Sequence, residues 1–167
     1  MENPMEVADD AAMSPDALAH AVAAAIRKRD RVSRQLGIDL LDIGPGRARM
    51  ALTVREDMLG GHDLCHGGIL FTLADTVCAY ACCSRNVASL SQTMNTAFVT
   101  PARLGDRLEA EAVELVSGGR TAYYDVRITN QTGQTVAVVR GQCRLLGQPV
   151  IAPQANAAGA ACDVGLR

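Results

Sequence analysis

HDLCHGGILFTLADTVCAYACCSR, residues 62–85, is the stretch of the sequence that determines the fold. After its glycine pair it continues to residue 85 without Gly or Pro, and the apolar residues of 69–83 surround the helix axis instead of forming one stripe. A helix that is apolar on nearly every side lies inside a protein. The segment is shorter than the roughly 20 apolar residues that span a bilayer. We therefore expect a central buried helix.

One carboxylate, Asp75, interrupts this apolar helix. Burying an unpaired ionised group is costly, so an acid in this position needs a partner or a function. A desolvated carboxylate holds its proton more tightly than one in water, which suits a general base. The alternative is a structural role, with Asp75 hydrogen-bonded to backbone, to Thr72 or to Thr76.

The rest of the chain predicts one further helix and six strands. Ser14 before Pro15 is typical of a helix start, and Gly37 of a helix end, which predicts a helix over about 15–35. Alternating apolar residues and turn signals predict strands at 38–43, 47–54, 87–99, 107–116, 121–129 and 135–145. The connectors between the last four strands are short enough for an antiparallel meander.

A single apolar helix must be covered, and a curved antiparallel sheet of about six strands is the only partner available. This predicts an α+β hotdog fold, a sheet wrapped around one central helix, with an extra N-terminal helix. We expect one domain over residues 14–146, a disordered N-terminus over 1–13 and a flexible C-terminal tail over 147–167. The free sheet edge favours a homodimer with a continuous sheet.

Composition argues against several classes of protein. A net charge of −2, a pI near 5.9 and 3% aromatic residues do not favour a nucleic-acid partner. The N-terminus lacks the pattern of a signal peptide, so we expect a cytoplasmic protein with no membrane partner. The six cysteines contain no CxxC pair and are expected to be small buried residues, with no metal site.

The sequence MLGGHDLCHGG at 58–68, followed by LADT at 73–76, resembles the acyl-CoA thioesterases of phenylacetate degradation (the PaaI type, hydroxyphenylacetyl-CoA thioesterases). FVTPARLGD at 98–106 is similar to the same family, and the resemblance covers about residues 30–146. It implies hydrolysis of small aromatic acyl-CoA thioesters to free acid and CoA. It also implies a homodimer that assembles to a homotetramer, and no cofactor, because coenzyme A is part of the substrate.

The resemblance also implies roles for individual residues. Asp75 would activate water or attack the thioester carbonyl itself, and the Gly67 amide would polarise that carbonyl. Free N–H groups at a helix N-terminus are suited to a developing negative charge, which agrees with this role for Gly67. His66, Gly68 and Thr76 are expected at the substrate, with His66 at the helix entry and bonded to neighbouring backbone.

The sequence departs from the family at Gly60, where the family has Asn or Gln to place water or substrate. Asp63 is the nearby side chain that could replace it. The departure keeps open an alternative function, a non-catalytic acyl-CoA-binding or regulatory hotdog protein. A hotdog dehydratase is disfavoured, because the helix lacks an Asp-His or Glu-His pair.

Other residues have alternative roles. Cys65 could act as a nucleophile beside His66, although adjacent loop residues seldom point at one substrate. Arg103, Arg140 and Arg144 could bind the phosphates of coenzyme A, or could simply be solvated.

Helix geometry separates the two proposed catalytic groups. Gly67 and Asp75 are eight residues apart, which places them roughly 12 Å apart along a helix axis. One helix cannot bring both groups to one carbonyl. We therefore expect an active site shared between two antiparallel central helices of a dimer.

Overall fold

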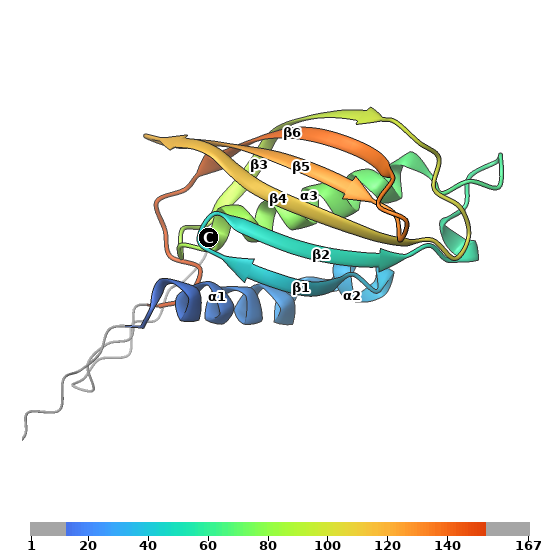
Figure 1. Ribbon diagram of the computed structural model, residues 1–167. Helices are drawn as coiled ribbons and strands as arrows, with labels where there is room; N and C mark the ends of the chain where they lie inside the picture. Colours follow the sequence, from blue (N-terminus) through green and yellow to red (C-terminus); the bar gives the residue numbers. More distant parts are fainter. Residues whose placement is uncertain (1–12, 153–167) are drawn as a thin grey trace, which may run out of the picture.

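The computed structural model describes residues 13–152, in which a curved sheet wraps one long helix (Figure 1). In chain order the elements are α1 (Pro15–Arg29), α2 (Arg31–Leu36), β1 (Asp39–Gly44), β2 (Arg47–Thr53), the 3-10 turn η1 (Glu56–Met58), α3 (Gly67–Cys83), β3 (Ser89–Phe98), β4 (Arg107–Gly118), β5 (Thr121–Thr129) and β6 (Thr135–Leu145). The predicted hotdog architecture is confirmed. The expected disorder over 1–12 and the end of the expected tail, 153–167, lie outside the described residues.

The N-terminal helix is divided in two, which corrects the single helix expected over 15–35. Asp30 has extended backbone angles (φ −75°, ψ 91°) and ends α1. Its carboxylate accepts a hydrogen bond from the Ser33 N–H at 3.0 Å and so caps α2. In a continuous helix the Ser33 N–H would bond to a backbone carbonyl of the preceding turn. Here the Asp30 carboxylate accepts it instead, so a new helix can start directly after Asp30.

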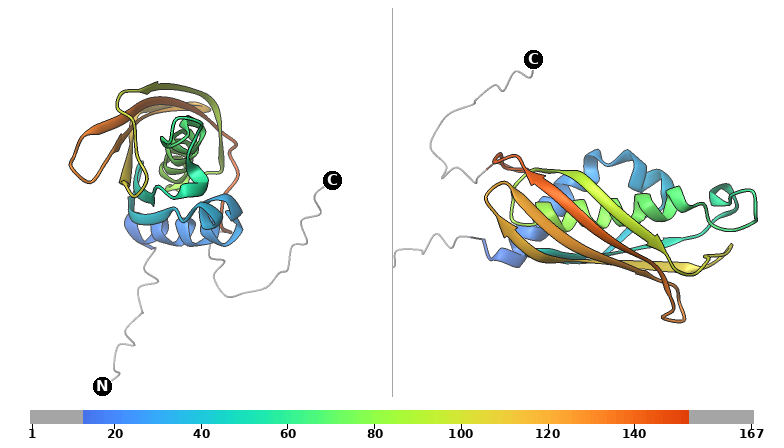
Figure 2. Two further views of the ribbon diagram at one scale, coloured as in Figure 1. Left: turned by 90° about the vertical axis from the view of Figure 1, so that its right-hand side faces the viewer. Right: turned by 90° about the horizontal axis from the view of Figure 1, so that it is seen from above.

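The sheet has the order β1-β2-β4-β5-β6-β3, and all its neighbours are antiparallel. The predicted meander is correct for β4, β5 and β6 but wrong for β3, which pairs with β6. Because β4 pairs with β2 on one side and β5 on the other, β3 has no place beside it and pairs with β6 at the edge opposite β1. The resulting sheet curves around α3, as the end-on view in Figure 2 shows.

The core lies between α3 and the concave face of the sheet. Leu73, Val77 and Cys78 have no exposed surface. Opposite them β4 presents the small side chains Ala110 and Ala112, which let the helix approach closely. The approach to β6 is also tight: a Cβ added to Gly141 would lie 2.7 Å from the Met94 Sδ and 3.0 Å from the Cys78 Sγ.

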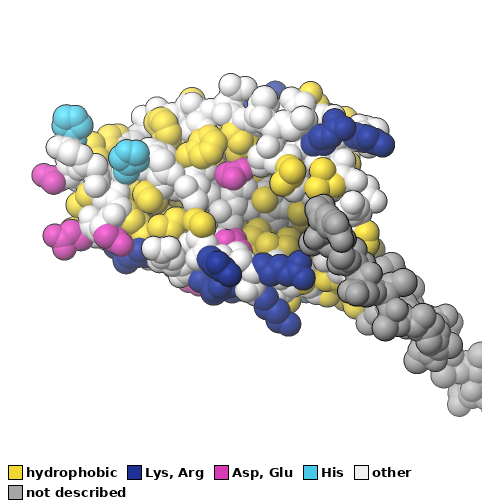
Figure 3. Space-filling model, turned by 180° about the vertical axis from the view of Figure 1, so that it is seen from behind, with side chains coloured by type: hydrophobic (Ala, Val, Ile, Leu, Met, Phe, Trp, Pro, Cys, Tyr) yellow, Lys and Arg dark blue, Asp and Glu magenta, His cyan; other side chains and the backbone are white. Residues whose placement is uncertain are grey.

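The prediction that α3 is buried on every side is wrong for the single chain. One stripe of the helix is half-buried or exposed, and its members are Gly68, Phe71, Thr72, Asp75, Thr76 and Ala79. Positions separated by three or four residues lie on one face of a helix. The sheet leaves this face uncovered (Figure 2), and it looks toward the viewer in Figure 3, where hydrophobic side chains gather across the middle.

The two edges of the sheet differ. α1 lies along β1 and also contacts α3 (Figure 1). β3 forms the other edge, with no further strand beside it among residues 13–152. Within that same range, no helix is long and apolar enough to cross a membrane.

Candidate active site

The turn that leads into α3 is fixed by His66. Its Nδ1 accepts the Gly68 N–H at 2.9 Å, so His66 caps the helix entry as expected. A neutral His66 in this arrangement carries its proton on Nε2. The His66 N–H donates to the Met58 carbonyl at 2.9 Å, and the Cys65 N–H donates to the Ala102 carbonyl at 2.8 Å. The first bond ties the turn to η1, and the second ties it to the loop that follows β3.

The first turn of α3 leaves one backbone donor free. The Ile69 N–H donates to the His66 carbonyl at 2.9 Å, and the Leu70 N–H reaches the same oxygen at 3.4 Å. The Gly68 N–H is taken by the His66 ring. Among the described residues the Gly67 N–H has no acceptor. A free N–H at the positive end of a helix dipole is suited to an anion or a polarised carbonyl oxygen.

An apolar hollow of about 350 Å³ adjoins this donor. Its lining consists of Leu64, Cys65, Gly67, Leu70, Phe98, Val99, Thr100, Pro101 and Ala102. A Cβ added to Gly67 would lie 3.1 Å from the Phe98 Cζ, closer than such contacts normally come. A side chain at 67 would therefore require the Phe98 ring to shift by a few tenths of an ångström, whereas glycine lets the ring lie close to the helix start.

Asp75 lies two turns further along α3, half-buried on its open side. Its Oδ1 accepts a hydrogen bond from the Ser91 Oγ at 2.6 Å. This partner replaces the two threonines considered from the sequence; the Thr72 hydroxyl donates to the Gly68 carbonyl at 2.8 Å instead. The surroundings of Asp75 are thus more polar and more open than the apolar helix sequence indicated.

Sequence reasoning missed Ser91. The pairing of β3 with β6 shifts register between Ser91 and Thr93. A bulge inserts one extra residue into the strand and so shifts the alternation of side chains by one position. Two residues on either side of the bulge that simple alternation would place on opposite faces then lie on the same face. Ser91 therefore points to the same side as Met94, although simple alternation would place it on the opposite face. The only indication of a role for Ser91 is the contact of its hydroxyl with the Asp75 carboxylate. That contact can be recognised only when the pairing of β3 with β6 is known.

Gly60 lies in a tight turn next to His66. Its N–H donates to the Leu64 carbonyl at 2.8 Å, and its own carbonyl accepts from the Asp63 N–H at 3.1 Å. A Cβ added to Gly60 would lie 3.5 Å from the His66 Cδ2, an ordinary contact. A side chain at 60 therefore fits and would lie beside the His66 ring. Asp63 itself is exposed and has a left-handed backbone, with φ of 56°.

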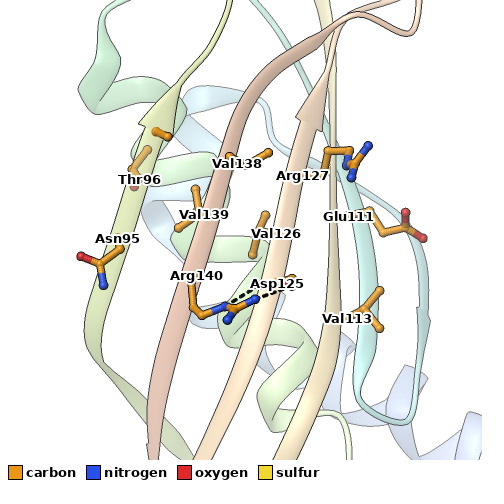
Figure 4. A pocket seen from close by; sticks show the side chains of 11 residues that line it. Asn95, Thr96, Glu111, Val113, Asp125, Val126, Arg127, Val138, Val139 and Arg140 are labelled. Atoms are coloured by element: carbon orange, nitrogen blue, oxygen red, sulfur yellow. Dashed lines mark hydrogen bonds and ion pairs between the residues drawn. The ribbon is translucent and has the colours of Figure 1, made fainter.

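The three arginines considered for phosphate binding are not gathered at one place. Arg140 pairs with Asp125 through two bonds of 2.8 and 2.9 Å on the sheet face away from α3 (Figure 4). That face contains a second hollow of about 770 Å³, and Arg144 lies on the same side of β6. Of the three, Arg103 is nearest to the Gly67 hollow along the chain, because it directly follows the pocket-lining Ala102.

The thiol of Cys65 does not suit a nucleophile. Burial, with a smaller contribution from the charge of Asp106, raises the pKa of Cys65 to about 11. A thiol that is protonated at neutral pH is a weak nucleophile. In residues 13–152 no three His, Cys, Asp or Glu side chains are grouped so that they could hold a metal ion.

Gly67 and Asp75 belong to one uninterrupted helix, so the expected separation of roughly 12 Å along its axis applies. The Ser91 bond leaves the second carboxylate oxygen of Asp75 without a partner among the described residues. A donor for an oxyanion, an apolar hollow and a carboxylate with a free oxygen are the groups that acyl transfer to water requires. Within one chain, however, the donor and the carboxylate cannot meet at one carbonyl.

Three comparisons place the chain among known proteins. Residues 62–137 match the model of the thioesterase superfamily. The acyl-coenzyme A thioesterase PaaI of Escherichia coli (strain K12) is 41% identical over 123 residues, which cover 74% of this chain and 88% of that protein. The structure of E. coli PaaI, from the phenylacetic acid degradation operon, aligns with a TM-score of 0.80 and 39% identity over 81% of this chain and 99% of that one. A mutant PaaI from Thermus thermophilus aligns with a TM-score of 0.68 and 35% identity, covering 70% of this chain and 100% of that one.

Proposed function

Because this chain belongs to the thioesterase superfamily and is an acyl-CoA thioesterase of the PaaI type, we propose that it hydrolyses small aromatic acyl-CoA thioesters. The acyl groups are of the phenylacetyl or hydroxyphenylacetyl type, and the products are the free acid and CoA. One observation carries the proposal: the unpaired Gly67 N–H opens onto an apolar hollow at the start of the helix that holds Asp75. The origin of the E. coli relative in a phenylacetic acid degradation operon supports the aromatic acyl group.

The mechanism follows from the donor and the carboxylate. The Gly67 N–H donates to the thioester carbonyl oxygen and stabilises the negative charge that develops there, aided by the helix dipole. Asp75 either takes a proton from the attacking water or attacks the carbonyl carbon itself. When Asp75 acts as the base, the C–S bond breaks and the proton taken from water passes to the leaving sulfur, so the free acid and CoA are released. When Asp75 acts as the nucleophile, cleavage of the C–S bond leaves an acyl anhydride on Asp75, and a water molecule hydrolyses it to the free acid and supplies the proton for the CoA thiolate. The Ser91 bond holds the carboxylate in one orientation throughout.

The remaining site residues bind or orient the substrate. His66 and Gly68 fix the helix entry through their mutual hydrogen bond. Thr76 is next to Asp75 and half-buried on the open side of α3, which is the side where this proposal puts the substrate. Arg103 is the best placed of the three arginines for the CoA phosphates, because Arg140 is already paired with Asp125. No cofactor is required beyond the CoA of the substrate.

The active site is completed by a second copy of the chain. The open side of α3 borders β3 through the Ser91–Asp75 hydrogen bond, so one partner can cover both this side and the unpaired edge of β3. Two α3 helices packed antiparallel through this side bring Gly67 of one protomer opposite the partner's Asp75. We further propose that such dimers pair into a homotetramer.

The decisive experiment measures CoA release with a thiol reagent over a panel of acyl-CoA thioesters. The proposal expects the highest kcat/KM for phenylacetyl-CoA or hydroxyphenylacetyl-CoA, with acetyl-CoA and long-chain acyl-CoA as comparisons. The alternative, a non-catalytic acyl-CoA-binding protein, is kept because Gly60 lacks the family side chain. Calorimetric binding of the same thioesters without CoA release would favour that alternative.

The shared site is tested by mixing two inactive variants, Asp75→Asn and Gly67→Pro. The second removes the N–H donor, and Pro is tolerated at the first position of a helix. Subunit exchange gives mixed dimers with one intact site and one doubly altered site, so activity should reappear. Mixed dimers that form, as native mass spectrometry would detect, yet stay inactive would contradict the shared site.

A further inference from the structure

Phe98, the last residue of β3, places the end of its ring against the backbone of Gly67. An ideal Cβ on Gly67 would meet three ring atoms, Cζ, Cε2 and Cε1, at 3.1, 3.4 and 3.6 Å. The side chain is nevertheless 56% exposed, so much of the ring is uncovered. An exposed aromatic ring at the wall of an apolar hollow is available to contact a ligand there.

The backbone on both sides of this ring is held in place. Phe98 pairs with Ala137 of β6, and the Val99 N–H donates to the Val136 carbonyl at 2.8 Å. Further along, the Ala102 carbonyl accepts the Cys65 N–H, which ties the same loop to the turn before α3. The Phe98 backbone therefore cannot withdraw from Gly67 without breaking strand or loop hydrogen bonds, so the ring remains at one wall of the hollow.

The position of the Phe98 ring affects one part of the acyl group, the carbon bonded to the reacting carbonyl. If the Gly67 N–H binds the carbonyl oxygen at about 3 Å, the adjoining carbon of the acyl group lies within contact range of a ring that touches Gly67. We propose that Phe98 is the specificity-determining residue for this part of the acyl group. It accepts an unsubstituted CH₂ next to the carbonyl, as in an arylacetyl group, and excludes a substituent on that carbon. This inference rests on the function proposed above.

The test compares two thioesters that differ by one methyl group, phenylacetyl-CoA and 2-phenylpropionyl-CoA. One carbon in an apolar site is worth about 10- to 200-fold in kcat/KM. We expect the wild-type protein to prefer phenylacetyl-CoA by at least about tenfold, and Phe98→Ala to reduce that preference by about tenfold. Phe98→Leu, which keeps part of the side chain, should give an intermediate preference and guards against misfolding of the alanine variant. The matched control is Leu104→Ala, at a side chain that is 58% exposed and does not line the hollow.

The outcomes separate this inference from the proposed function. The inference is supported if the ratio of kcat/KM for phenylacetyl-CoA to that for 2-phenylpropionyl-CoA falls in both Phe98 variants and stays constant in Leu104→Ala. A wild-type protein that hydrolyses both thioesters equally well would overturn the role of Phe98 and leave the thioesterase function standing, as would an unchanged preference in Phe98→Ala. A wild-type protein that releases CoA from neither thioester nor from the rest of the panel would overturn both.

Discussion

On the side of α3 that faces the sheet, Leu73, Ala74 and Val77 have no exposed surface, whereas on the other side Phe71 keeps 38% of its surface exposed and Asp75 is half-buried. The first side packs against the strands and determines the fold. The second carries the Asp75 carboxylate at its border with β3, where the Ser91 hydroxyl donates to it. Together with the proposed function, this difference assigns stability to one face of the helix and chemistry to the other, so substitutions on each face should affect one property and leave the other largely unchanged.

The largest effect is expected on the open side, from Asp75→Asn. Loss of a general base or nucleophile typically costs about 10²- to 10⁴-fold in turnover, and we expect a loss of about 100-fold or more. CoA release measures the activity, and urea unfolding should give a free energy of unfolding close to that of the wild type. A variant that kept more than about a tenth of wild-type turnover would make Asp75 structural, since base catalysis contributes far more than that.

The converse effect is expected on the buried side, from Leu73→Ala. Removing a fully buried leucine costs about 2–5 kcal/mol of unfolding free energy because it leaves a cavity. The measurement is urea unfolding, with Thr72→Ala on the open side as the control, expected within about 0.5 kcal/mol of the wild type. The folded fraction of Leu73→Ala should keep its turnover per active molecule. Equal costs for the two variants would remove the distinction between the faces.

A smaller effect is expected from Ser91→Ala, which removes the hydrogen bond to Asp75. Hydrogen bonds to charged groups contribute about 1.5–3 kcal/mol, so kcat should fall at least about tenfold. Because Ser91 orients the carboxylate and does not bind the acyl group, KM should change much less than kcat. Ser91→Thr keeps the hydroxyl and should restore most of the rate. If the threonine variant were as slow as the alanine variant, the hydroxyl would not be the cause.

The smallest effect is expected from Gly60→Asn, which restores the family side chain beside His66. The space for a Cβ at this position predicts that the fold is kept. We expect turnover to rise by a few-fold, as one additional hydrogen bond of about 1 kcal/mol would give. Gly60→Ala supplies the Cβ without the amide and should leave the rate unchanged. An asparagine variant without activity would indicate that this chain places its water around the glycine.

The parts of the fold that depend on local pattern were predictable from the sequence. Strict alternation gave the bounds of β5 and β6 as the structure has them, and the apolar run gave the position of α3. The position of β3 in the sheet was not predictable, because its partner β6 lies far along the chain, beyond β4 and β5, and no local pattern encodes the pairing. The sequence predicted α3 to be buried on nearly every side because Phe71 and Ala79 are apolar. Apolar residues on an open face cannot be distinguished from core residues by sequence pattern alone.

For the site, motif and helix geometry indicated Gly67, His66 and Asp75, and the structure places His66 at the helix entry as predicted. Ser91 and Phe98 could not be connected to the site from the sequence. Each reaches α3 only through the pairing of β3 with β6, and for Ser91 also through the bulge. Residues that join a site through long-range pairing have no signal in the local sequence pattern.

The helix beside β1 has a consequence for growth of the sheet between molecules. A fibre formed by strand addition needs a free strand at both ends of each unit, so that every added copy offers a new end. Here α1 lies along β1 and only β3 is unflanked by helix or strand within residues 13–152. If two copies pair through β3, as in the proposed dimer, neither copy keeps a free edge strand within that range. Sheet extension would then end at two chains, and a protein with a long exposed strand would be protected from open-ended polymerisation.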